Sequence, residues 1–138
     1  MILSLVDAVY SYATENEILD KESLEILLQK RFPNYDKNAE NHYNLISALH
    51  KSIRGSDPDA ALYWCARMIT AGEDVKYLLR RLTRIASEDV GLADPLALVQ
   101  AHCAWDSYER LGSPEGDLAV ASLAVYLATA PKSVGVYK

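Results

Sequence analysis

Helix start and stop signals recur along this chain and point to a helical fold. A Ser or Asp before Pro favours a helix start, because the polar side chain caps free backbone N–H groups and Pro lacks one at the first helical position. A Gly after the last apolar residue favours a helix end in a left-handed turn. The bracketing pairs are Ser56-Asp57-Pro58 with Gly72, Asp94-Pro95 with Gly112, and Ser113-Pro114-Glu115 with Pro131.

Apolar residues at spacings of three and four predict the remaining helices. The clearest runs from Val75 to Ala86 and is closed by Gly91. Weaker patterns cover residues 41–53, 21–31 and 1–13, and no stretch has the alternation of a convincing strand. We therefore predict an all-α fold, a bundle of about seven helices joined by short loops.

Composition and length narrow the class of protein further. A chain of 138 residues is long enough for a core of its own. The net charge of −5 gives no general attraction to nucleic acid or to an acidic membrane. The amino terminus does not resemble a secretory signal, and the apolar run 118–130 is too short to span a bilayer. These features predict a soluble, cytoplasmic protein without membrane contact.

The polar stretch 32–41 is the one plausible linker, and it suggests a division into residues 1–34 and 35–138. The helix that follows Pro114 is apolar almost all round, which predicts a place in the centre of the bundle or in a subunit interface. Cys65 and Cys103 lie in apolar stretches, so we expect two buried, reduced thiols.

The sequence predicts no catalytic, metal-binding or cofactor-binding residue in this chain. None of the six glycines is followed by Lys, so the P-loop pattern is missing. His42, His50 and His102 lack the spacing of zinc ligands. His50 follows Ser47 on the same predicted helix and His102 adjoins Cys103, and we favour a structural interpretation for both pairs. Glu88 and Asp89 would be the first candidates if the chain were an enzyme.

Basic residues form a stripe opposite the apolar face of the predicted helix 75–86. Lys76, Arg80 and Arg84 recur every four residues, with Arg81 beside them. Arg84 and Glu88 stand four residues apart and should pair, worth about 0.3–0.5 kcal/mol if exposed. The stripe fits a solvated face, a contact with an anionic protein surface, or a phosphate contact on DNA.

A second cluster joins Tyr63 and Trp64 with Arg67, residue types that are enriched at interface hot spots. Core packing is the alternative for these aromatic residues, although Leu62, Cys65 and Ile69 already supply an inward stripe. Trp105 and Tyr108 fit the core better. Lys51 and Arg54 end a predicted helix, where basic residues complement the helix dipole.

Residues 42–64 have a wording that resembles the carboxyl-terminal region of the replication-associated recombination protein A family, also called the maintenance of genome stability A family. The Werner helicase-interacting ATPase is its eukaryotic relative. The resemblance covers about residues 35–138. It is carried by Lys51-Ser52-Ile53-Arg54-Gly55-Ser56-Asp57-Pro58, Ala86-Ser87-Glu88-Asp89-Val90-Gly91 and Ala130-Pro131-Lys132-Ser133.

The resemblance implies a DNA-dependent AAA+ ATPase that is related to clamp loaders and acts at stalled replication forks. It implies a homotetramer assembled through this helical region, a clamp-loader-like collar, nucleoid association, and DNA and single-stranded-DNA-binding protein as partners of the parent protein. ATP and Mg²⁺ would bind in a core that precedes Met1, so the chain is expected to be a fragment. Residues 1–34 resemble the end of an AAA+ lid.

We therefore expect a non-enzymatic segment for oligomerisation and coupling, with a helical DNA-binding module as the alternative. The expected contacts with a partner or a second subunit are Arg54, Tyr63, Trp64, Arg67, Arg80, Arg81 and Arg84. The possible DNA contacts are Lys51, Arg54, Lys76, Arg80 and Arg84.

Overall fold

A computed structural model describes residues 38–137, and across these residues the chain is helical and has no strand. The all-α prediction is confirmed for this part. The predicted helices at 1–13 and 21–31, and the boundary after residue 34, lie outside the described residues, so the count of about seven helices stays a prediction. The helices are α3 (Asn38–Arg54), α4 (Pro58–Thr70), α5 (Val75–Ile85), α6 (Leu96–Leu111) and α7 (Asp117–Thr129).

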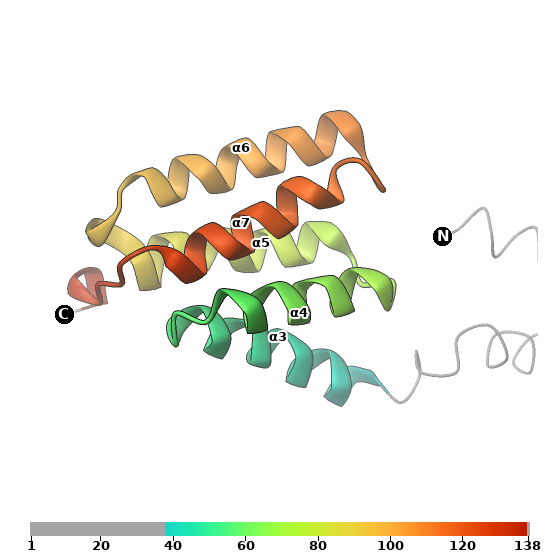
Figure 1. Cartoon of the computed structure of the whole chain (residues 1–138), viewed down its shortest axis with the longest axis horizontal. Helices are drawn as coiled ribbons and strands as arrows, with labels where there is room; N and C mark the ends of the chain where they lie inside the picture. The colour runs from blue at the N-terminus through green and yellow to red at the C-terminus, as the bar shows by residue number, and fades with distance from the viewer. Residues whose placement is uncertain (1–37, 138) are drawn as a thin grey trace, which may run out of the picture. The chain divides into compact units, whose positions relative to one another are not determined.

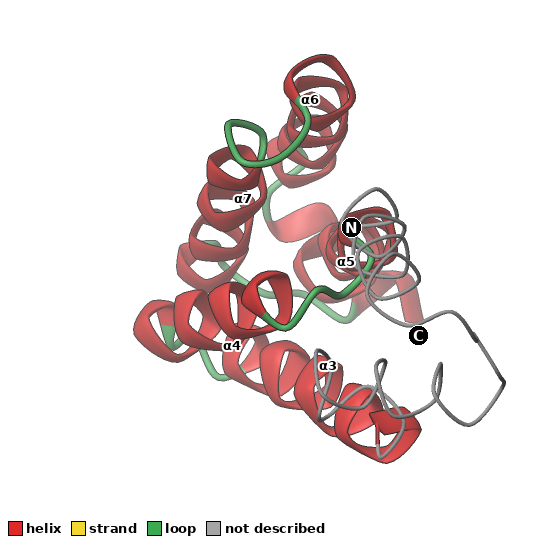
Figure 2. Ribbon diagram, turned by 90° about the vertical axis from the view of Figure 1, so that its right-hand side faces the viewer, coloured by secondary structure: helices red, strands yellow, loops and turns green. Residues whose placement is uncertain are grey.

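The packing described here is that of residues 42–137. α7 lies between α6 and α4 in both views and also packs against α5 (Figure 1 and Figure 2). This central place agrees with the apolar character of α7 around its whole circumference. α3 adds the buried side chains of Ile46, Leu49 and Ile53 to the core.

α5 shows how the sequence pattern produces the core. Its buried residues recur every three or four positions, so all of them lie on one side of the helix. Burying one such aliphatic side chain contributes about 2 kcal/mol. The Asp74 carboxylate caps the helix by accepting from the Lys76 amide. The buried residues of α5 are Val75, Leu78, Leu79, Leu82 and Ile85.

Several predicted helix ends are confirmed by the backbone. Asp57 caps α4, because its carboxylate accepts a hydrogen bond from the Ala60 amide at 3.0 Å. Gly72 follows α4 with φ of 85°, and Gly112 follows α6 with φ of 67°. These left-handed conformations are costly for residues with a side chain, which explains why Gly stops the helices there.

Two predicted boundaries are wrong. α3 begins at Asn38, so the last four residues of the predicted linker 32–41 are helical. Residues 113–116 form a turn, and α7 starts at Asp117 instead of Pro114. The turn is closed locally, because the Ser113 hydroxyl donates to the Asp117 carboxylate.

Two side chains predicted to face inward are exposed. Leu62 points outward from α4, whose buried residues are Ala61, Cys65 and Met68. Cys103 is exposed on α6, whereas Cys65 is buried as predicted. Burial raises the pKa of the Cys65 thiol to about 12, with a smaller contribution from the charge of Asp117.

Trp105 and Tyr108 are half-buried and pack against the core, close to what the sequence predicts. Among the described helices, none is long and apolar enough to cross a lipid bilayer.

The turn before α7 supplies a first prediction. A Cβ added at Gly116 would lie 2.6 Å from the Gly112 carbonyl oxygen and 2.9 Å from the Tyr108 ring. Because the closest of these atoms is backbone, Gly116→Ala should lower the free energy of unfolding by about 1–3 kcal/mol in urea titration. Ser122→Ala, at an exposed position of α7, should change it by less than about 0.5 kcal/mol. Equal stabilities for the two variants would contradict this packing.

Candidate functional site: a polar junction at the end of α3

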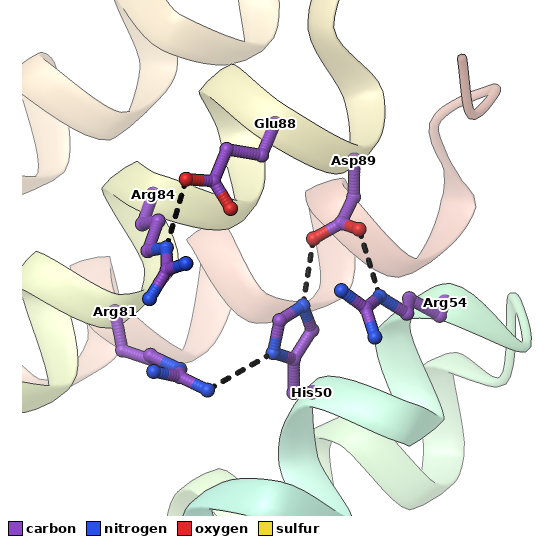
Figure 3. A network of polar contacts seen from close by, with 6 residues as sticks. All are labelled: His50, Arg54, Arg81, Arg84, Glu88 and Asp89. Atoms are coloured by element: carbon purple, nitrogen blue, oxygen red, sulfur yellow. Dashed lines mark hydrogen bonds and ion pairs between the residues drawn. The ribbon is translucent and has the colours of Figure 1, made fainter. Parts of the chain in front are cut away.

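A buried carboxylate holds the carboxyl-terminal end of α3 against the end of α5. Asp89 accepts from His50 Nε2 at 2.7 Å through Oδ2 and from Arg54 Nε at 2.7 Å through Oδ1 (Figure 3). His50 and Arg54 stand four residues apart on α3, so both side chains point to the same side of that helix. We call the set His50, Arg54, Arg81, Asp89 and Lys132 the junction.

The hydrogen bonds of His50 assign its protonation. Arg81 Nη2 lies 3.3 Å from His50 Nδ1, and a guanidinium can only donate. Nδ1 therefore accepts, and Nε2 carries the proton that is donated to Asp89. In this arrangement the ring is neutral and lies between a cation and an anion. Arg81 Nε is buried and has no hydrogen-bond partner within the described part of the chain.

A π-helical turn places Asp89 in the junction. α5 ends at Ile85, and the next five residues form the turn η1 (Ala86–Val90), in which Ala86, Asp89 and Val90 are buried. Gly91 follows with φ of 50° and begins the short helix η2 (Gly91–Ala93). π-turns are rare and are frequently found at functional positions.

The carboxyl-terminal segment is attached to the same turn. The Ser133 amide donates to the Asp89 carbonyl at 2.8 Å. The Lys132 ammonium donates to the carbonyls of Ala128 and Ala130 at the end of α7, and to the Ser56 hydroxyl at 3.2 Å. Three motifs that are distant in sequence therefore meet here. They lie around Arg54, Asp89 and Lys132.

The junction shifts the acid–base properties of its buried groups. Burial alone would raise the pKa of Asp89, but hydrogen bonds from Arg54 and His50 outweigh burial and lower it. Burial also lowers the pKa of His50, and the charges of Arg54 and Arg81 act in the same direction against the attraction of Asp89. The native state therefore favours an ionised Asp89 and a neutral His50.

This arrangement is suited to holding elements together. Each carboxylate considered as an enzyme candidate is engaged, Asp89 with two donors and Glu88 with Arg84 at 2.8 Å. Within residues 38–137, no group of three or more His, Cys, Asp and Glu side chains is placed to hold a metal ion.

The predicted basic stripe is present, but much of its charge is paired. Lys76 contacts Glu109 at 2.8 Å, and Arg84 pairs with Glu88 as predicted. The Arg80 guanidinium lies 5.9 Å from the centre of the Tyr77 ring. Arg81 turns away from the stripe toward His50 and joins the junction.

The predicted aromatic cluster forms a local unit on α4. Arg67 donates to the Tyr63 hydroxyl at 3.1 Å, and its guanidinium lies 5.8 Å from the centre of the Trp64 ring. Tyr63 and Arg67 are exposed, whereas Trp64 is half-buried against the core. Lys51 is exposed on α3. Of the seven predicted contact residues, the structure brings Arg54 and Arg81 into one network, and the role of all seven as contacts stays a prediction.

Pattern reasoning on single helices missed the partnership of His50 with Asp89. The two residues are 39 positions apart, and neither carries a local signal for its partner. The signal that could have found it was the family wording, because both residues lie in stretches that carry the resemblance.

The fold and the junction define a helical domain that lacks a nucleotide-binding loop and is held together by its own polar network. Two family models match the chain. One is described as the MgsA AAA+ ATPase C terminal and covers residues 55–138, and the other is described as an AAA C-terminal domain and covers residues 1–54. The chain therefore belongs to the MgsA AAA+ ATPase C-terminal family.

Individual relatives agree with this assignment. The replication-associated recombination protein A of Escherichia coli K12 is 54% identical over 120 residues, which cover 87% of this chain and 27% of that protein. The protein of the same name from Haemophilus influenzae is 49% identical over 140 residues, 99% of this chain and 31% of that protein. The ATPase WRNIP1 of Dictyostelium discoideum is 47% identical over 116 residues, 84% of this chain and 13% of that protein. The chain spans less than a third of each of these relatives.

The two neighbouring carboxylates of the π-turn give a second prediction. Asp89→Ala removes the acceptor of a buried histidine and should lower the free energy of unfolding by about 3 kcal/mol. Glu88→Ala removes a partly exposed ion pair and should cost less than about 1 kcal/mol. Urea titrations of both variants measure the difference. A smaller loss for Asp89→Ala than for Glu88→Ala would contradict the role assigned to Asp89.

The histidine of the junction gives a third prediction. Because folding lowers the pKa of His50, the unfolded chain binds a proton more readily, and stability should fall as the pH drops through the ordinary value of 6.5. The free energy of unfolding should therefore be lower at pH 5 than at pH 8. His50→Gln should remove a large part of this dependence, whereas His102→Gln, at an exposed position, should retain it. An unchanged pH profile in His50→Gln would overturn the assignment.

Proposed function

We propose that this chain is the assembly and coupling region of an AAA+ ATPase that acts in DNA replication and recombination. Its own part is non-enzymatic: it joins subunits and transmits movement between the ATPase part and a helical collar. The names of the bacterial relatives and of the Dictyostelium ATPase support the setting. ATP and Mg²⁺ belong to the ATPase core of the parent protein. DNA and single-stranded-DNA-binding protein are proposed as partners of that whole protein, which would work at the nucleoid.

One observation carries the coupling role. α3 falls within the stretch that matches the AAA C-terminal domain model, while α4 to α7 fall within the other matched family. Ile46, Leu49 and Ile53 of α3 are buried in the core, and its end is tied to Asp89. A displacement of α3 is therefore passed directly to the π-turn and to the carboxyl-terminal segment.

The alternative of a DNA-binding module is less well supported. Of the cations proposed to contact DNA, Lys76, Arg84 and Arg54 each pair with a carboxylate of this chain. A phosphate would have to displace these partners, and the acidic chain offers little compensation.

The fourth prediction tests the proposal in solution. Light scattering of this chain over a concentration series should give a tetramer whose mass is the same at low and high salt. Added single-stranded oligonucleotide should not bind, because phosphate contacts would lose affinity steeply as salt rises. A monomer at all concentrations would contradict the proposal. A monomer that binds the oligonucleotide only at low salt would favour the DNA-binding module.

A further inference from the structure

α6 distributes its apolar side chains in an unusual way for a surface helix. Its fully buried residues are Ala97, Ala101 and Ala104, so only small side chains face the core. The larger aliphatic residues Leu96 and Val99 are 61% and 52% exposed. A helix whose sole role is to cover a core places its large apolar residues inward, since burial energy scales with apolar area.

The exposed side of α6 also lacks charge along more than half of its length. Residues 96–105 contain no Asp, Glu, Lys or Arg. Leu96, Val99 and the exposed Cys103 are spaced by three and four residues, so they share one side of the helix. We call this set the α6 outer face. Beyond it, Asp106 and Arg110 pair with each other at 2.9 Å and leave no net charge.

We infer that the α6 outer face is the surface through which two copies of this chain pack against each other. The inference rests on the proposed function and names the contact that the assembly would use. A central apolar patch with a polar margin is the arrangement found in stable protein interfaces, where charged residues are depleted from the centre. A two-fold symmetric contact needs a single surface that is complementary to itself.

Charge selects a second copy as the occupant. Each copy carries a net charge of −5, so two copies repel over most of their surfaces. The α6 outer face is the part of this helix where they can meet without placing like charges together. It offers a basic or acidic partner no charge to pair with. The exposed aromatic cluster of α4 differs, because it presents the charge of Arg67.

The fifth prediction compares two surfaces by substitution. The double variant Leu96→Asp and Val99→Asp places charge in the α6 outer face. It should raise the dissociation constant of the assembly by about 30-fold or more, the effect of losing a hot spot, as measured by sedimentation equilibrium. Both residues are exposed and near the start of a helix, where Asp is favourable, so the fold should be retained. The matched control is Leu62→Asp on α4, where the side chain is 41% exposed.

The outcomes separate the inference from the proposed function. Dissociation of the double variant, with Leu62→Asp still assembled, supports the α6 outer face. An assembled wild-type chain whose mass is unchanged by the double substitution overturns this inference and leaves the proposed function standing. A wild-type chain that is monomeric throughout overturns both.

Cross-linking provides a second measurement that does not depend on the folding of a variant. Cys103 is exposed within the α6 outer face, whereas Cys65 is buried with a raised pKa and should not react. A short bis-maleimide should therefore link two wild-type chains through Cys103, and Cys103→Ser should abolish the product. Linked chains persisting in Cys103→Ser, or a wild-type assembly that gives no cross-link, would contradict the inference.

Discussion

The contact on which the described domain depends is the buried carboxylate of Asp89. A charge inside a protein must be compensated by hydrogen bonds and counter-charges, and here His50 and Arg54 of α3 supply both. The same residue fixes the carboxyl-terminal segment through its carbonyl group and Ser133. Apolar burial supplies most of the stability of a core, but it is not directional. The Asp89 contacts are directional, and they determine how α3, the π-turn and the final segment meet.

Directional contact at one end and an uncovered apolar face on another helix serve different purposes. The junction is satisfied almost entirely by groups of this chain, so it acts within one subunit. The α6 outer face has no partner among the described residues, and its large side chains gain burial only when another surface covers them. Together they describe a region that would be rigid within a subunit and adhesive between subunits, as a coupling and assembly role requires.

Local signals predicted the helices better than they predicted the site. Apolar spacing identified α5, and Asp57 with Gly72 identified the limits of α4, because these effects act within a few residues. The start of α7 was missed, since Pro114 is equally at home in a turn. The pairing of His50 with Asp89 joins distant positions and depends on tertiary packing. Helical spacing therefore could not reveal it, although the family wording included both residues.

Hydrogen exchange tests most directly whether α3 is fixed to the rest of the domain. Amides from Leu49 to Ile53 should exchange as slowly as those of α5, because both segments open only when the common core opens. In Asp89→Ala, exchange should become faster at the end of α3 while α5 remains protected. Fast exchange of α3 in the wild-type chain, alongside a protected α5, would contradict the claim that α3 is held by the core and by Asp89.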